Sequence, residues 1–237
     1  MSSRDPEYEL AVPLPEDDLS EEFKVAEELA SWAEIDLAAE GWQAFKKLLG
    51  PLQTERPVTW QHSQRVATYA LGLATVEGGW EDQRLLVYGG LAHDLGKLAV
   101  PQAIAENFEN FETESEAEKR AKKAANRHHP DDGFAIIKQA GFPFTAAVAG
   151  AHHRYQASPY GIPLSEMADN LGLELTADDS AYLEDAVRLI ALADHFDAML
   201  TRSPNMFEAE RRAELMKDFS LPTDTARIDW LEANQIA

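Results

Sequence analysis

The sequence predicts an all-α protein. Apolar residues recur at steps of three and four positions through most of the chain, which is the period of amphipathic helices. The alternation of apolar and polar residues that is typical of strands is nearly absent. Glycine and proline separate the periodic segments, as at Gly78-Gly79, Gly141 with Pro143, and Ser203-Pro204. These three observations indicate a domain built from short helices.

The N-terminal part divides into two segments. Residues 1–18 combine acidic side chains with three prolines, so we expect a flexible acidic arm. Residues 19–50 have the helical period, with Gly50-Pro51 as the predicted stop and a break near Gly41. This N-terminal helical segment is predicted to pack on the rest of the chain, or else to form a dimer contact, through an apolar stripe of Phe23, Leu29, Trp32 and Leu37.

The main domain is predicted to span residues 51–237. It shows no internal repeat. A segment rich in Glu and Lys at 107–127 is predicted to be a solvated helix or a flap. The helical period predicts helices at 58–76, 81–95, 113–127, 131–140, 143–153, 179–201, 205–219 and 224–235.

The composition excludes several classes of function. The chain has 42 Asp and Glu against 21 Lys and Arg, a formal charge of -21, which would repel a polyphosphate backbone and argues against long nucleic acids as partners. It has no cysteine, so any metal must be held by nitrogen and oxygen. No apolar run approaches the roughly 18 residues of a membrane span, and the acidic N-terminus is unlike an export signal. We therefore expect a cytoplasmic protein without a membrane segment.

The seven histidines point to a metal site. Several adjoin an aspartate or another histidine, as in His93-Asp94 and His152-His153, and these side chains suit first-row divalent metals. A single histidine is more often an ordinary core or surface residue. Adjacent residues on a helix diverge by about 100°, so such pairs fit two neighbouring ions better than one. A bridging carboxylate such as Asp94 could join the two ions.

Five motifs resemble the HD superfamily of metal-dependent phosphohydrolases, and specifically its HD-GYP branch. The resemblance covers about residues 58–201, with the motifs in the order of that family. The motifs are His62-Ser63-Gln64-Arg65-Val66, then His93-Asp94-Leu95-Gly96-Lys97 (the HDxGK motif) with Val100-Pro101, His129-Pro130-Asp131-Asp132-Gly133 (HPxxG), Ala151-His152-His153, and Ala193-Asp194-His195-Phe196-Asp197-Ala198-Met199.

This resemblance implies an all-α HD-domain helical bundle with a central two-metal site. Asp94 would bridge the ions, which are iron or manganese first, with nickel and zinc as alternatives. Some members hold a third ion with a glutamate four residues before the first histidine, but Val58 stands there, so two ions are expected. The implied ligands are His62, His93, Asp94, His129, His152, His153 and Asp194.

One loop departs from the pattern of the branch. After the paired histidines the HD-GYP proteins continue with Glu-Arg and a DGxGYP loop, whereas this chain reads Arg154-Tyr155-Gln156-Ala157-Ser158-Pro159-Tyr160-Gly161-Ile162-Pro163. Gly161 and Pro163 are retained, the aspartate is missing, and Ile162 replaces the tyrosine. Metal binding is therefore expected, while the identity of the substrate stays open.

The resemblance implies a two-metal phosphodiesterase that hydrolyses a cyclic dinucleotide of the cyclic di-GMP class through a metal-bridging hydroxide. Asp94 and Lys97 are the expected catalytic residues. Lys97, Arg154 and Arg65 are candidate phosphate contacts, although Arg65 fits the orientation of a carboxylate better. Asp197 is expected to support a ligand, and His128 and His195 to be solvated or supporting.

Two alternatives remain open. One is a general HD phosphohydrolase that acts on nucleoside phosphates, and the other is a low-turnover metal- or nucleotide-binding signalling domain. The expected partner is a small nucleotide, and a homodimer or a signalling partner is a further candidate.

Overall fold

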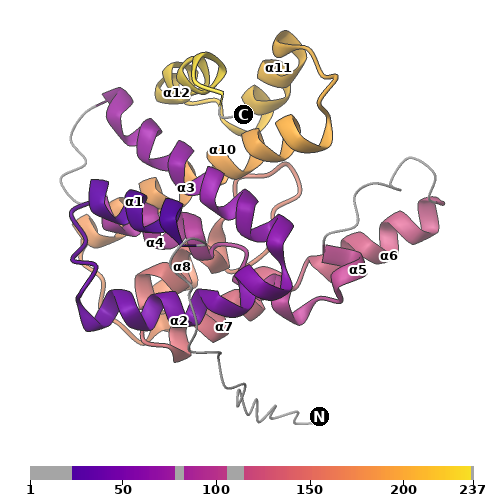
Figure 1. The fold of residues 1–237 in the computed structure, drawn as a ribbon. Helices are drawn as coiled ribbons and strands as arrows, with labels where there is room; N and C mark the ends of the chain where they lie inside the picture. The colour runs from indigo at the N-terminus through magenta and orange to yellow at the C-terminus, as the bar shows by residue number, and fades with distance from the viewer. Residues whose placement is uncertain (1–22, 78–82, 106–114, 236–237) are drawn as a thin grey trace.

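The computed structural model describes residues 23–77, 83–105 and 115–235, and this part of the chain is helical without a strand (Figure 1). The all-α prediction is therefore confirmed. The α-helices are α1 (Lys24–Trp32), α2 (Glu40–Glu55), α3 (Pro57–Glu77), α4 (Arg84–Ala92), α5 (Gln102–Ala105), α6 (Glu116–Asn126), α7 (His129–Gln139), α8 (Pro143–Ala151), α9 (Met167–Leu171), α10 (Ala177–Arg202), α11 (Glu208–Asp218) and α12 (Pro222–Ala233); the 3-10 helices are η1 (Leu95–Ala99) and η2 (Leu164–Glu166).

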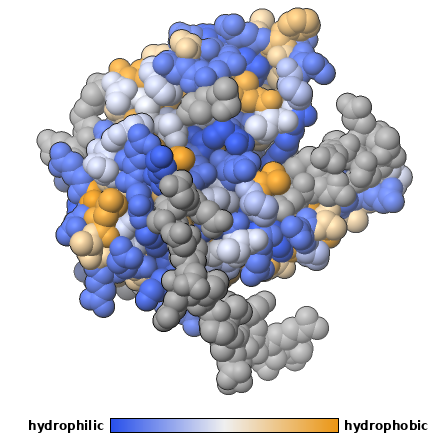
Figure 2. Space-filling model, viewed as in Figure 1, coloured by the Kyte–Doolittle hydropathy of each residue, from blue (hydrophilic) through white to orange (hydrophobic). Residues whose placement is uncertain are grey.

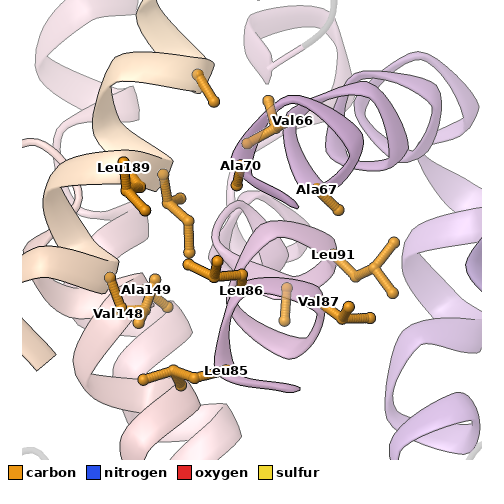
Figure 3. Packing of buried hydrophobic residues seen from close by; sticks show 14 of the residues in the cluster. Val66, Ala67, Ala70, Leu85, Leu86, Val87, Leu91, Val148, Ala149 and Leu189 are labelled. Atoms are coloured by element: carbon orange, nitrogen blue, oxygen red, sulfur yellow. The ribbon is translucent and has the colours of Figure 1, made fainter. Parts of the chain in front are cut away.

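Helices α3, α4, α8 and α10 form the centre of the bundle. Their apolar side chains, including Leu86, Val148 and Leu189, meet in one continuous core (Figure 3). Helices α3 and α4 approach very closely, because a Cβ atom on Gly90 would lie 2.5 Å from the Cα atom of Ala67. Small residues at this crossing let the two helices bring their polar side chains to a shared site.

The N-terminal helices α1 and α2 pack on this core, as the apolar stripe predicts. Phe23 and Leu29 are fully buried. Phe45 of α2 contacts Tyr88 of α4 and Phe142 ahead of α8, with ring centroids 4.4 and 5.3 Å apart. The prediction for Trp32 was wrong, because this residue ends α1 and 60% of its surface is exposed.

The predicted helix stop at Gly50-Pro51 was also wrong, since α2 continues to Glu55. A proline inside a helix removes one hydrogen bond and costs about 3 kcal/mol. Here the buried Leu49 and Leu52 lie on either side of Pro51, so burial of the continued helix offsets that cost. The break expected near Gly41 lies earlier, at residues 33–39, where Glu34 adopts a positive φ of 56°.

Several other boundaries differ from the predicted ones. Helix α7 begins at His129, two residues early, because Pro130 suits the first turn of a helix. Helix α4 ends at Ala92, and the chain then turns into η1. Helices α5 and α9 were not predicted. Residues 1–18 and the first part of the segment 107–127 lie outside the described residues, whereas α6 is the predicted solvated helix and buries none of its side chains.

Helices α11 and α12 cover one end of α3 and α10 (Figure 1). Arg188 of α10 holds α12 in place through a bidentate ion pair with the buried Asp224. The visible face of the molecule is mostly hydrophilic (Figure 2). Within the described residues, no helix combines the length and the apolar character that a membrane span needs.

Candidate metal centre

The structure brings all seven predicted ligand residues into one buried cluster. His62 lies within α3 and Asp194 within α10, while the other five stand at helix ends. His93 and Asp94 follow α4, His129 begins α7, and His152 and His153 follow α8. None of the seven has more than 8% of its surface exposed. The ends of short helices thus direct these side chains to the centre of the bundle.

The cluster has two parts, with Asp94 between them. Oxygen Oδ2 of Asp94 faces Nε2 of His62 at 3.6 Å and Nε2 of His93 at 3.5 Å. Oxygen Oδ1 faces Nε2 of His129 at 3.2 Å and Nε2 of His152 at 3.9 Å. Asp194 completes the first part, with Oδ1 3.0 Å from Nε2 of His62, and His153 completes the second, with Nε2 3.2 Å from Nε2 of His129.

Three of the imidazoles are held in the same way by the backbone. Nδ1 of His93, His129 and His152 donates a hydrogen bond to the carbonyl oxygen three residues earlier, at 2.8, 2.6 and 2.7 Å. A donor at Nδ1 leaves Nε2 of a neutral ring with its lone pair, and this arrangement is typical of metal-binding histidines. The local helical turn therefore fixes both the tautomer and the direction of each ring.

These residues fit divalent metal ions. Nε2 of His129 lies 3.3 Å from Nε2 of His152 and 3.2 Å from Nε2 of His153, a convergence of nitrogens that a shared cation would stabilise. Nε2 of His93 is buried and has no hydrogen-bond partner among the described residues, although buried polar atoms normally have one. Three sets of side chains could each hold an ion: His62, His93 and Asp194; His93, Asp94 and His152; and His129, His152 and His153.

The protonation states of the cluster also suit metal binding. Burial, with the neighbouring His93 and His129, lowers the pKa of His152 to about 3, and burial also lowers the pKa of His93 and His153. Burial alone would raise the pKa of Asp94, but Lys97 and His93 outweigh it and hold that pKa well below its usual value. These three rings are thus neutral and the Asp94 carboxylate is charged at neutral pH, as metal ligands must be.

Two glycines allow the cluster to form. A Cβ atom on Gly96 would lie 1.9 Å from the carbonyl oxygen of His129, and one on Gly133 would lie 3.2 Å from the backbone nitrogen of Gly96. The backbones of η1 and α7 are therefore in contact at this point. This contact explains the glycines of the HDxGK and HPxxG motifs, because it places Asp94 beside His129.

Asp197 positions His62 rather than joining the cluster. Its Oδ2 accepts a hydrogen bond from Nδ1 of His62 at 2.6 Å. Arg65 binds both oxygens of Asp197, at 2.7 and 3.0 Å. Burial raises the pKa of Asp197, but His62 and Arg65 more than compensate, and the pKa is lowered. Arg65 thus orients a carboxylate and does not line the cleft above the cluster.

A cleft of about 850 Å³ opens above the cluster. His129, His153 and Asp194 contribute to its floor, and Lys97 lines it while forming a buried ion pair with Asp94. Its rim comes from α6, from the loop after α8 and from the C-terminal part of α10. Arg154 contacts the carbonyl oxygen of Gly161 at 3.5 Å and is not among the lining residues, so the structure does not place it as a phosphate contact.

The divergent loop supplies side chains that sequence reasoning missed. The Tyr160 ring stacks on the His153 ring, with centroids 4.4 Å apart and planes at 23°, and Arg127 covers the Tyr160 ring at 4.8 Å. The Gln156 amide lies 2.6 Å from Nδ1 of His153. The only sequence signal was an aromatic residue two positions before the tyrosine of the DGxGYP pattern. His195 lines the cleft near Asp218, and His128 is exposed.

Comparison with known proteins gives three matches. The sequence model described as HD domain matches residues 59–199, nearly the range of the five motifs. The chain is 32% identical over 148 residues to 3′3′-cGAMP-specific phosphodiesterase 1 of Vibrio cholerae serotype O1, a match that covers 62% of this chain and 30% of that protein. This chain thus spans less than a third of that relative.

The fold is also similar to the crystal structure of the HD domain of the L. monocytogenes phosphodiesterase PgpH. The TM-score is 0.56 at 19% sequence identity, and the match covers 78% of this chain and 95% of the other. At that identity the similarity concerns the helical fold alone.

Proposed function

We propose that this chain, which belongs to the HD domain family, is a metal-dependent phosphodiesterase that hydrolyses a cyclic dinucleotide. The observation that carries the proposal is the position of Asp94. Its two carboxylate oxygens face separate groups of buried histidines beneath the cleft, at 3.2 to 3.9 Å. A carboxylate so placed suits a pair of divalent ions better than one.

The residues that would hold the metals are His62, His93, Asp94, His129, His152, His153 and Asp194. Two bound divalent ions would lower the pKa of a water and polarise the phosphoryl oxygens of the substrate. Asp197 and three backbone carbonyls fix the ring orientations, so the ligands are in place before an ion arrives. This preorganisation keeps the reaction geometry constant from one turnover to the next.

Lys97 is the chain's own candidate for a phosphate contact. Its ammonium group lines the cleft and is paired with Asp94, so it lies beside the place where a phosphate oxygen would gain charge. A buried lysine of this kind both holds the carboxylate and offers a further hydrogen-bond donor to an anion. We assign the catalytic roles to Asp94 and Lys97.

Two features support a cyclic dinucleotide as the substrate. The cleft volume of about 850 Å³ lies in the upper part of the range of small-molecule sites, roughly 300–1,000 Å³, and is large for a mononucleotide. The V. cholerae relative is named for its action on 3′3′-cGAMP. The HD-GYP resemblance favours cyclic di-GMP, and 3′3′-cGAMP is the second cyclic dinucleotide to test.

The test is a substrate screen with defined metals. The purified chain is stripped of metal, loaded with iron, manganese, nickel or zinc, and assayed with both cyclic dinucleotides, a linear dinucleotide and nucleoside monophosphates. Metal content per chain is measured in parallel. We expect about two ions per chain and hydrolysis of a cyclic dinucleotide.

Two results would contradict the proposal. Hydrolysis of monophosphates alone would favour the general phosphohydrolase. Tight nucleotide binding without product under any metal would favour the signalling domain.

A further inference from the structure

We propose that the basic face of α6 is a binding subsite for the second phosphate of the substrate. We define this face as Lys119, Arg120, Lys122 and Lys123, all of which line the cleft. The inference rests on the proposed function, because a cyclic dinucleotide carries two phosphodiesters on one ring. When one of them lies at Asp94 and Lys97, the other must lie elsewhere in the same cleft.

The charge of the cleft is opposite to that of the molecule. Among the described residues that line it, seven are Lys or Arg and three are Asp or Glu, whereas the whole chain carries a net charge of -21. Arg127 and Arg202 add to the basic face of α6. Such a local concentration of positive charge on an acidic protein attracts and retains an anion at that place.

Packing against the described residues contributes little to the position of helix α6. It buries none of its side chains and projects to one side of the bundle (Figure 1). Local interactions stabilise it instead, since Ser115 and Glu118 form a reciprocal capping box at its start. Its two acidic residues lie in the first turn, and its cations follow toward the end nearer the metal centre. This order also suits the helix dipole.

The helix is tied to the reaction site through its last residue. The backbone oxygen of Asn126 accepts the hydrogen bond from Nδ1 of His129, at 2.6 Å. Arg127 then covers Tyr160, whose ring stacks on His153. The end of α6 therefore contacts His129 directly, and it is linked to His153 through Arg127 and Tyr160. Lys119 is also ion-paired with Glu116 at 3.1 Å, a pair at the surface that a bound phosphate could replace.

The test compares two substrates and two matched variants. The first variant combines Lys119→Gln, Arg120→Gln and Lys123→Gln, which removes three cations from the cleft and keeps good helix formers. The control combines Lys24→Gln, Lys47→Gln and Lys217→Gln, three exposed lysines outside the cleft, and has the same net charge. The substrates are the cyclic dinucleotide that the wild type hydrolyses and bis(p-nitrophenyl) phosphate, which has a single phosphodiester.

We expect the α6 variant to raise KM for the cyclic dinucleotide about tenfold, with a weaker salt dependence and little change in kcat. The KM for bis(p-nitrophenyl) phosphate should stay within about twofold, and the control should change neither. Circular dichroism verifies that the variants are folded. An unchanged KM for the cyclic dinucleotide, or an equal rise for both substrates, would overturn the subsite.

The failure of the proposed function would look different. In that case the wild type itself would cleave bis(p-nitrophenyl) phosphate but neither cyclic dinucleotide, and the subsite would be overturned with it. If the wild type hydrolyses a cyclic dinucleotide and the α6 variant matches it, only the subsite is wrong.

Discussion

The metal centre and the rim of the cleft are built on opposite principles. The centre is buried, and its side chains are held by helix ends, by backbone carbonyls and by Asp197. The rim consists of an exposed helix and an irregular loop, which meet where Arg127 covers the ring of Tyr160. The centre is thus suited to holding the reacting groups in one geometry, whereas the rim is suited to contacts with the rest of the substrate. Substitutions in the two regions should have different kinetic consequences.

The largest effect is expected from Asp94→Asn. The amide keeps the size of the side chain but removes the charge that faces both histidine groups, and it leaves Lys97 buried without its partner. We expect metal-dependent hydrolysis to fall by at least about a thousandfold, with fewer ions bound per chain. Activity assays and metal analysis measure both effects. Wild-type turnover in this variant would show that the charge of Asp94 is not needed for hydrolysis.

Gly96→Ala should be nearly as damaging, although it changes no functional group. The added Cβ atom would lie 1.9 Å from the carbonyl oxygen of His129, so η1 and α7 would have to separate. We expect a lower melting temperature and a loss of metal affinity. The matched control is Gly41→Ala on α2, where a Cβ atom meets nothing within 4 Å. Equal melting temperatures for the two variants would contradict the packing argument.

Asp197→Asn should weaken metal binding without removing a ligand. The variant loses the charge that pairs with Arg65 and orients His62 through Nδ1. Supporting carboxylates of this type are typically worth 10- to 100-fold in metal affinity. Metal titration measures the change, with Asp169→Asn, at an exposed position, as the control. Unchanged affinity would show that His62 is oriented without Asp197.

The metal-free protein should lose stability on acidification. His93, His152 and His153 have lowered pKa values in the folded state, so the unfolded chain takes up protons below about pH 6.5 before the folded chain does. The pKa of His62 is raised, because Asp194 and Asp197 outweigh burial, so its contribution has the opposite sign and is lost as pH rises. The three histidines with lowered pKa values should outweigh His62, so we expect a net loss of stability as the pH falls.

Urea unfolding of the metal-free protein between pH 7.5 and 5 measures this effect. A midpoint that rises on acidification would mean that the histidines are charged in the fold. Below about pH 4 a further loss is expected, since the lowered pKa values of Asp94 and Asp194 start from an ordinary value of 3.8.

The smallest effect is expected at Tyr160 on the rim. Tyr160→Ala removes the ring between Arg127 and His153, and we expect KM for the substrate to rise several-fold with a modest change in kcat. Tyr160→Phe keeps the stack and should resemble the wild type. A large fall in kcat for both variants would show that Tyr160 takes part in the reaction and not only in substrate binding at the rim.

The sequence predicted the centre far better than the rim. The five motifs indicated which residues converge through their resemblance to the HD superfamily, and the structure brings these residues together at helix ends. Their roles as metal ligands and the number of ions stay predictions. The missed features depend on contacts across the fold. The burial of Leu49 and Leu52 carries α2 through Pro51, and Trp32 is exposed although its spacing fits the stripe.

The position of Tyr160 could not be predicted for a similar reason. The loop is fixed by a hydrogen bond from the Ile162 backbone nitrogen to the Gly150 oxygen and by Gly161, whose φ is 80°. Neither interaction leaves a periodic signal in the sequence. Arg154 was a candidate because it follows the paired histidines, but helix α8 has ended there and the side chain turns to Gly161.

The burial of α1 and α2 has a consequence for the smallest unit that can fold. The region that matches the family begins at residue 59, after these two helices. Yet Phe23, Trp42 and Phe45 are at most 1% exposed. A fragment restricted to residues 59–199 would therefore leave the aromatic faces of Tyr88 and Phe142 uncovered. Such a fragment should aggregate, and the N-terminal helices are an integral part of the hydrophobic core.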